Sequence, residues 1–211
     1  MSPRSLQDDI KQNKPWCLEE EAYLNIARTA AVLDHALVQA LKPFAITPTQ
    51  YNVLRILRGA GPDGLCRNEV GERLVRRVPD VTRLLDRMEE TGLLARARDD
   101  ADRRYVTARI SPQGLALLDR LDQEILRIHR AQLGHVDRKQ LKQLVDLLTS
   151  VRMALAANEL KRPGVSTEVV AETVGYQSVA AFRRAFSQHF DMTPAHWRRS
   201  NVETQQARVE D

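Results

Sequence analysis

The sequence predicts a mainly α-helical protein that contains one short β-hairpin. Leu, Val and Ala recur at spacings of three and four over most of the 211 residues, whereas aromatic residues make up only 5% of them. Residues 93–110 differ from this pattern. A run of Leu, Ala and Arg precedes a cluster of aspartates, and a run rich in Tyr, Val, Thr and Ile follows it. Proline, glycine and capping residues divide the remainder into separate helices.

The N-terminal part is predicted to be a polar tail followed by a long helix. Residues 1–15 are polar and end at Pro15, so we expect a tail without a secretory signal. A helix is expected over residues 18–41, where an apolar stripe recurs every three or four residues: Ile26, Ala30, Leu33, Leu37 and Leu41. Pro43 ends it.

A group of three shorter helices follows, and the first has a strong start signal. Thr47 can cap it, Pro48 suits its first turn, and Gln50 stands where the partner of a capping box belongs. Two further helices are expected at residues 67–75 and 79–91. Three helices and then a hairpin are the element order of a winged helix-turn-helix, with the hairpin as a two-stranded β-wing.

The C-terminal half predicts two long helices and a small unit. One helix is expected from Pro112 to about Gly134, and its apolar stripe is Leu118, Leu121, Ile125 and Ile128. The longest is expected from Asp137 to about Leu160. The apolar face of the longest helix is predicted to be Leu141, Leu144, Leu148, Val151 and Leu155. A small helix-turn-helix is expected over residues 165–199, with three phenylalanines on the inner face of its second helix: Phe182, Phe186 and Phe190.

The helix at 79–91 has an apolar face and a basic face, and this pattern predicts contact with duplex DNA. Its inner face is Val81, Leu84, Leu85 and Met88, whereas Asp80, Arg83 and Arg87 share another side and Arg76 and Arg77 come just before it. A helix fits the major groove, and arginine there pairs with guanine and phosphate. The wing arginines can enter the minor groove or lie on phosphates: Arg96, Arg98, Arg103, Arg104 and Arg109.

Composition narrows the class of protein further. The net charge is +4, and the two cysteines, Cys17 and Cys66, are too few and too far apart for a disulfide framework. No apolar run approaches the ~20 residues that span a membrane, so a cytoplasmic protein is expected. The sequence contains no Gly-rich phosphate loop, no pairing of nucleophile and base, and no histidines at metal-ligand spacing. We therefore expect a protein that is not an enzyme and that has no cofactor and no metal.

Two strings resemble those of MarR-family regulators: ITPTQYNVL at residues 46–54 and VPDVTRLLDRMEETGL at 78–93. The resemblance covers roughly residues 18–150 and includes Asp102-Arg103-Arg104 at the wing. It implies a homodimer built on the N- and C-terminal helices of this region, with a small-molecule pocket between that interface and the DNA-binding lobes. Tyr23 and His35 are candidates to line such a pocket. By matching position, the residues at base edges would be Pro79, Asp80, Thr82 and Arg83, with Arg104 as the wing arginine.

The last part of the chain resembles the DNA-binding domains of AraC-family regulators. The strings are RMALAA at 152–157, VGYQS at 174–178, FRRAF at 182–186 and MTP at 192–194. In that family the first string belongs to a linker helix and the others to the second of two helix-turn-helix units, and the first unit is missing here. By position, the residues that would face DNA are Gln177, Ser178, Arg183 and Arg184. DNA contact, packing on the dimer and contact with polymerase all stay open for this unit.

The sequence thus predicts a polar tail (1–15), a MarR-like winged helix-turn-helix and dimerisation domain (16–160), an AraC-like half domain (161–200) and a second polar tail (201–211). The predicted function is a ligand-responsive transcriptional regulator, a repressor, that binds a pseudo-palindromic duplex as a homodimer. The alternative is a protein-interaction adaptor of transcription in which the helix-turn-helix units serve as scaffolds.

Overall fold

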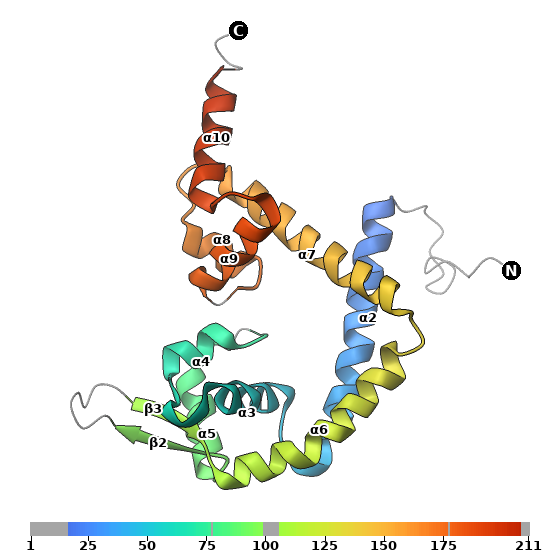
Figure 1. Ribbon diagram of the computed structural model, residues 1–211, viewed down its shortest axis with the longest axis vertical. Helices are drawn as coiled ribbons and strands as arrows, with labels where there is room; N and C mark the ends of the chain where they lie inside the picture. The colour runs from blue at the N-terminus through green and yellow to red at the C-terminus, as the bar shows by residue number, and fades with distance from the viewer. Residues whose placement is uncertain (1–16, 77, 99–105, 177, 208–211) are drawn as a thin grey trace, which may run out of the picture.

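The computed structural model describes residues 17–76, 78–98, 106–176 and 178–207, and within these it is mainly helical, as predicted (Figure 1). Short 3-10 turns at Lys42–Phe44 and Gly61–Asp63 flank the helix at Pro48–Ala60. The helices are α2 (Leu18–Leu41), α3 (Pro48–Ala60), α4 (Arg67–Arg73), α5 (Val81–Glu90), α6 (Pro112–Leu133), α7 (Arg138–Leu160), α8 (Thr167–Thr173), α9 (Val179–Phe190) and α10 (Pro194–Ala207).

Local side-chain caps fix where several helices begin. The Thr47 hydroxyl accepts from the Gln50 backbone N–H at 3.2 Å, and the Gln50 side-chain oxygen Oε1 accepts from the Thr47 backbone N–H at 2.8 Å. This is the predicted capping box of α3, and it satisfies two N–H groups that have no partner inside the helix. Ser111 caps α6 and Asp137 caps α7 with one bond each, because their side chains accept from the backbone N–H groups of Gly114 and Gln140.

The predicted hairpin is present, and it belongs to a three-stranded sheet. Strands β2 (Leu94–Arg98) and β3 (Val106–Ile110) pair antiparallel, with Leu94 opposite Ile110. The other edge of β3 is paired with β1 (Leu65–Cys66), a strand absent from the sequence prediction. Two residues are too few to show an alternating pattern, so this strand is defined by its partner rather than by its own sequence.

One hydrophobic core unites α3, α5, α6 and the sheet. The predicted inner faces of α5 and α6 are confirmed, because Leu85, Met88, Leu118 and Leu121 are all buried in it. It also takes up the end of α2 at Leu41, together with Val53, Leu54, Leu57, Val70, Leu93 and Leu94. This core holds α5 and the hairpin at a fixed mutual orientation.

A second, separate core lies at the C-terminal end of the chain. Phe182 and Phe186 of α9 are fully buried, and the Trp197 ring of α10 lies 6.0 Å from that of Phe186. The end of α7 contributes to this core through Met153, Ala156, Ala157 and Leu160. The last turns of α7 therefore belong to this second core. Helix α10 continues to Ala207, into the segment expected to be a polar tail.

The chain forms an open arc in which α2 and α6 lie side by side and α7 leads away from them to the C-terminal unit (Figure 1). The middle of α7 packs into neither core. Of its predicted apolar face, Leu144, Val151 and Leu155 are therefore exposed, and so are Val145 and Leu147 beside them. Helix α2 also has exposed apolar side chains: Tyr23, Ile26 and Val32. Within the described ranges, no helix combines the length and apolarity that a bilayer crossing requires.

Candidate nucleic-acid interface

Helix α5 presents a polar face to solvent, from the residues just before its start to its last turn. Thr82, Arg83 and Arg87 are exposed, whereas Leu85 and Met88 anchor the opposite face. Pro79 and Asp80 lie just before the helix and are also exposed. The Asp80 carboxylate accepts from the Arg83 backbone N–H at 2.9 Å, so Asp80 is the N-cap of α5. The structure thus brings Pro79, Asp80, Thr82 and Arg83 to one end of one helix.

Arg67, at the start of α4, joins this surface although the sequence analysis did not single it out. Its guanidinium donates to the Thr82 hydroxyl at 3.3 Å, across 15 positions of the chain. No local pattern indicates this contact, because the two residues are 15 positions apart and on different helices.

The wing arginines divide into those that hold the fold and those left for other contacts. Arg96 is a quarter exposed and lies 2.6 Å from Asp86 and 2.7 Å from Glu89 of α5. The Arg96 guanidinium, and then its backbone N–H, lower the pKa of the Glu89 carboxyl by hydrogen bonding to it. Arg109 donates to the Asp63 carbonyl oxygen at 3.4 Å. Both arginines therefore contact the protein itself.

The remaining wing residues lie at or beyond the limits of the described chain. Arg98 is the last residue of β2, and its side chain lies outside the described part of the structure. Asp102, Arg103 and Arg104 also lie outside the described residues, as does Arg77 before α5. Their predicted roles at DNA stay predictions.

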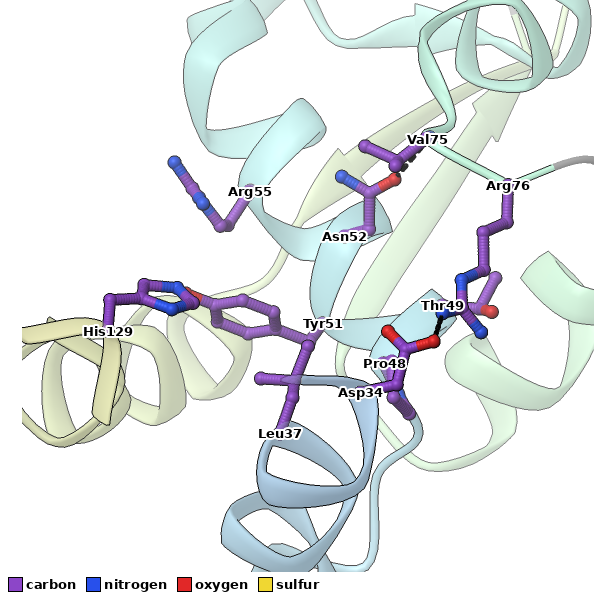
Figure 2. Close-up of a pocket in the computed structure, with 10 residues that line it drawn as sticks. All are labelled: Asp34, Leu37, Pro48, Thr49, Tyr51, Asn52, Arg55, Val75, Arg76 and His129. Atoms are coloured by element: carbon purple, nitrogen blue, oxygen red, sulfur yellow. Dashed lines mark hydrogen bonds and ion pairs between the residues drawn. The ribbon is translucent and has the colours of Figure 1, made fainter. Parts of the chain in front are cut away.

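Arg76 points back to the protein rather than along α5. Its guanidinium forms an ion pair with Asp34 of α2, 42 positions earlier (Figure 2). Next to it, the Val75 backbone N–H donates to the Asn52 side-chain oxygen at 2.9 Å. The segment that leads into α5 is therefore tied to both α2 and α3.

These contacts form part of the wall of a cavity of about 180 Å³ between α2, α3 and α6 (Figure 2). Tyr51 of α3, only 7% exposed, and Leu37 of α2 give it an aromatic and aliphatic floor. Neither Tyr23 nor His35, the predicted candidates, lines it, since both are exposed on α2. The full lining is Asp34, Leu37, Pro48, Thr49, Tyr51, Asn52, Arg55, Val75, Arg76 and His129.

The C-terminal unit presents its own basic side chains. Ser178 caps α9, its hydroxyl accepting from the Ala181 backbone N–H at 3.3 Å. Arg183 and Arg184 are exposed on α9, and Arg183 lies 4.0 Å from Glu168 of α8. Gln177 lies outside the described residues. Across the described part of the chain, His, Cys, Asp and Glu side chains form no group that could hold a metal ion.

Sequence comparison matches two parts of the chain to two families. The MarR family profile matches residues 46–104, and a helix-turn-helix domain profile matches residues 124–200. The HTH-type transcriptional regulator YkoM of Bacillus subtilis (strain 168) is 33% identical over 122 residues, which are 55% of this chain and 77% of YkoM. The RCS-specific HTH-type transcriptional activator RclR of Escherichia coli (strain K12) is 32% identical over 77 residues, but these are only 27% of RclR.

Solved structures agree with the first match. A MarR transcription factor from Planctomyces limnophilus is 34% identical, with a TM-score of 0.51 over 64% of this chain and 98% of that one. Sco3205, a MarR family regulator from Streptomyces coelicolor solved in complex with DNA, shares the fold at 20% identity and a TM-score of 0.60, over 68% of this chain and 92% of Sco3205. The winged lobe, its exposed basic helix and these relatives together identify the chain as a DNA-binding transcriptional regulator, not an enzyme, that belongs to the MarR family.

Proposed function

We propose that the protein is a ligand-responsive repressor that binds a pseudo-palindromic duplex as a homodimer, with one α5 helix in each of two successive major grooves. The observation that carries this proposal is the exposed face of α5, on which Thr82, Arg83 and Arg87 stand clear of the core. A helix placed in this way can reach base edges, and arginine there reads guanine with two hydrogen bonds. Two-fold symmetry then places half-sites about one helical turn apart.

Dimerisation is supported by apolar surface that one chain leaves open. Leu147 is 65% exposed and Tyr23 is 70% exposed, on α7 and α2 respectively. Large apolar side chains gathered on two helices favour burial against another surface. A second copy that covers these helices would bury them, and it would set the distance between the two α5 helices.

The cavity beside Arg76 supports control by a small molecule. Its wall includes residues of α2, which carries the exposed apolar surface, and the segment that leads to α5. BpsR of Bordetella bronchiseptica, whose DNA binding is regulated by 6-hydroxynicotinic acid, has the same fold at 23% identity. A ligand that binds one arrangement of the lobes better than another changes DNA affinity by that difference.

The C-terminal unit is proposed as a domain of residues 161–200, supported by the last turns of α7, that adds contacts to DNA. Ser178, Arg183 and Arg184 lie at the start and on the outside of α9, where a recognition helix would carry them. A single small unit buries little surface, and its contacts are expected to be mainly with phosphates.

The experiment that tests this function is salt-dependent binding to a duplex recovered from a random pool by the full-length protein. We expect two chains per duplex, and a slope of about −0.9 for each phosphate neutralised in a plot of log affinity against log salt. Arg83→Ala should weaken binding by roughly 1–3 kcal/mol and relax specificity at one base pair. Arg127→Ala on α6 removes the same charge away from α5, and it should leave affinity unchanged.

Two results would contradict the proposal. A flat salt dependence would show that phosphate contacts do not drive binding. An equal loss with Arg83→Ala on every sequence would show that Arg83 does not read a base. A stable complex with another protein that survives Arg83→Ala would instead favour the adaptor.

A further inference from the structure

The Thr82 hydroxyl, on the exposed face of α5, is held by a side chain from another helix. Arg67 is the first residue of α4, and its Nη1–H donates to Thr82 Oγ1 at 3.3 Å. Thr82 is the second residue of α5 and is exposed to solvent. Within the described part of the chain, this is the one hydrogen bond of the Thr82 side chain, so the hydrogen of its hydroxyl has no acceptor there.

The Arg67 guanidinium is itself fixed by its neighbour Asn68. Its Nε–H and an Nη2–H donate to the Asn68 side-chain oxygen at 3.3 Å and 3.1 Å. A guanidinium has five N–H donors in one plane, and the bonds to Asn68 and Thr82 use three of them. Two N–H groups are therefore left without an acceptor among the described residues, and the plane in which they lie is set.

Helices α4 and α5 are held together by packing, so this bond joins two fixed points. Val70 of α4 and Leu85 of α5 are buried in the same core. A Cβ added at Gly71 of α4 would lie 3.5 Å from Val81 Cγ2 of α5, which shows how closely the two helices approach. Because the core already places both backbones, the bond to Thr82 sets the direction of a hydroxyl rather than the position of a helix.

A threonine hydroxyl that rotates freely discriminates poorly between base edges, because it can donate or accept. The guanidinium of Arg67 removes this freedom, since it bonds to the Thr82 oxygen and turns the hydroxyl hydrogen away from its positive charge. The hydroxyl then presents a donor to the open side of α5. In the major groove it fits an acceptor, which is N7 or O6 of guanine, N7 of adenine or O4 of thymine, and it does not fit the amino groups of cytosine and adenine.

We propose that Arg67 is a positioning residue for DNA sequence recognition, which acts through Thr82 by making its hydroxyl a fixed donor. This inference rests on the proposed function, because Thr82 reaches a base edge only if α5 enters the major groove. One base pair of the recognised duplex is then selected for an acceptor at the place that Thr82 reaches. The two remaining N–H groups of Arg67 add a contact to phosphate, which does not depend on sequence.

The experiment measures the affinity of the full-length protein for the duplex recovered from a random pool and for duplexes that differ from it by one base pair. Thr82→Val replaces the hydroxyl by a methyl group of similar size, and the base pair whose preference falls is the one that Thr82 reads. Arg67→Met should reduce the preference at that same base pair roughly three- to tenfold, the contribution of one net hydrogen bond. It should also weaken binding to every duplex and reduce the salt slope by about 0.9, because one phosphate contact is lost.

Three comparisons separate positioning from a general loss of binding. In the Thr82→Val background, Arg67→Met should change no base preference further, because the hydroxyl that it orients is gone. Thr82→Ser keeps the hydroxyl, so its preference should survive and should still fall with Arg67→Met. Arg73→Met removes the same charge from the exposed other end of α4, and it should leave every base preference as in the parent.

Three results would overturn this inference while the proposed function stands. An equal loss of affinity on all duplexes with Arg67→Met would show that Arg67 only neutralises phosphate. A loss of preference that persists in the Thr82→Val background would show that Arg67 reads the base itself, and unchanged preferences in Thr82→Val would show that Thr82 reads none. A parent protein that selects no sequence from the pool would instead refute the proposed function, and this inference with it.

Discussion

Replacing Arg96 by Met should loosen the wing from α5. The Arg96 guanidinium lies 2.6 Å from Asp86 and 2.7 Å from Glu89, and its Nε–H donates to Glu89 at 2.8 Å. Methionine keeps much of the aliphatic stem but removes all three contacts, and it leaves two carboxylates of the same helix face without their shared cation. The Arg96 backbone N–H, which donates to Glu89 at 2.9 Å, remains.

The magnitude follows from how far this site is shielded from water. A hydrogen bond to a charged group contributes about 1.5–3 kcal/mol when shielded, and an exposed ion pair about 0.2–1 kcal/mol. Arg96 is 25% exposed and its partners are 43% and 37% exposed, so the site lies between these limits. We expect the free energy of unfolding to fall by about 1–2 kcal/mol, and DNA affinity to fall because the hairpin is no longer held against α5.

Arg127→Met is the matched control. Arg127 also makes two bonds to one carboxylate, at 2.6 Å and 3.0 Å from Glu124, but it is 72% exposed and lies on one helix. Its loss should leave the free energy of unfolding nearly unchanged, because solvent screens an exposed ion pair. Denaturant unfolding at pH 7 measures the free energy of unfolding of both variants. Equal losses would show that neither shielding from water nor the connection between β2 and α5 makes the Arg96 contacts stronger than those of Arg127.

The same cluster predicts a pH dependence. The pKa of Glu89 is lowered from its ordinary value of 4.5 by the bonds from Arg96. Its contribution to stability is therefore present above that ordinary value and is lost as the pH falls through the lowered value in the folded protein. The difference in unfolding free energy between the parent and Arg96→Met should shrink on acidification below the ordinary value, and a constant difference would contradict this assignment.

Two further predictions concern the two cores. A Cβ at Gly114 would lie 2.2 Å from the Leu93 carbonyl oxygen and 2.9 Å from Ile110 Cγ1, so Gly114→Ala should destabilise the winged lobe by roughly 1–3 kcal/mol. Gly59→Ala, with no described atom within 4 Å of its new Cβ, should be neutral or stabilising by up to about 1 kcal/mol. Denaturant unfolding measures both variants, and a Gly59→Ala protein less stable than Gly114→Ala would refute this packing. Phe186→Ala should cost about 3–5 kcal/mol and unfold the C-terminal unit alone, seen as proteolysis after α7 and a shorter DNA footprint from a protein that is still dimeric. Loss of the winged lobe in the same step would show that the two cores are coupled.

Much of the local structure was predictable because its causes lie within a few residues of each other. Thr47, Pro48 and Gln50 fix the start of α3 through contacts that span three positions, and Asp137 does the same for α7. The apolar periodicity of α5 and α6 identified the residues that are buried, since a helix turns a fixed angle per residue whatever surrounds it. The exposed face of α5 followed from the same periodicity.

The features that only the tertiary structure decided are those whose partners are far apart in the chain. Nothing near Arg76 indicates that its partner is Asp34, and nothing near Arg96 separates an arginine that faces Asp86 and Glu89 from one that faces solvent. The apolar stripe of α7 is periodic like that of a core helix, yet its middle is exposed and its last turns enter a second core. The sequence determined which faces are apolar or charged, whereas the folded chain decided what each face meets, because a residue's own spacing carries no record of the distant segment that packs against it.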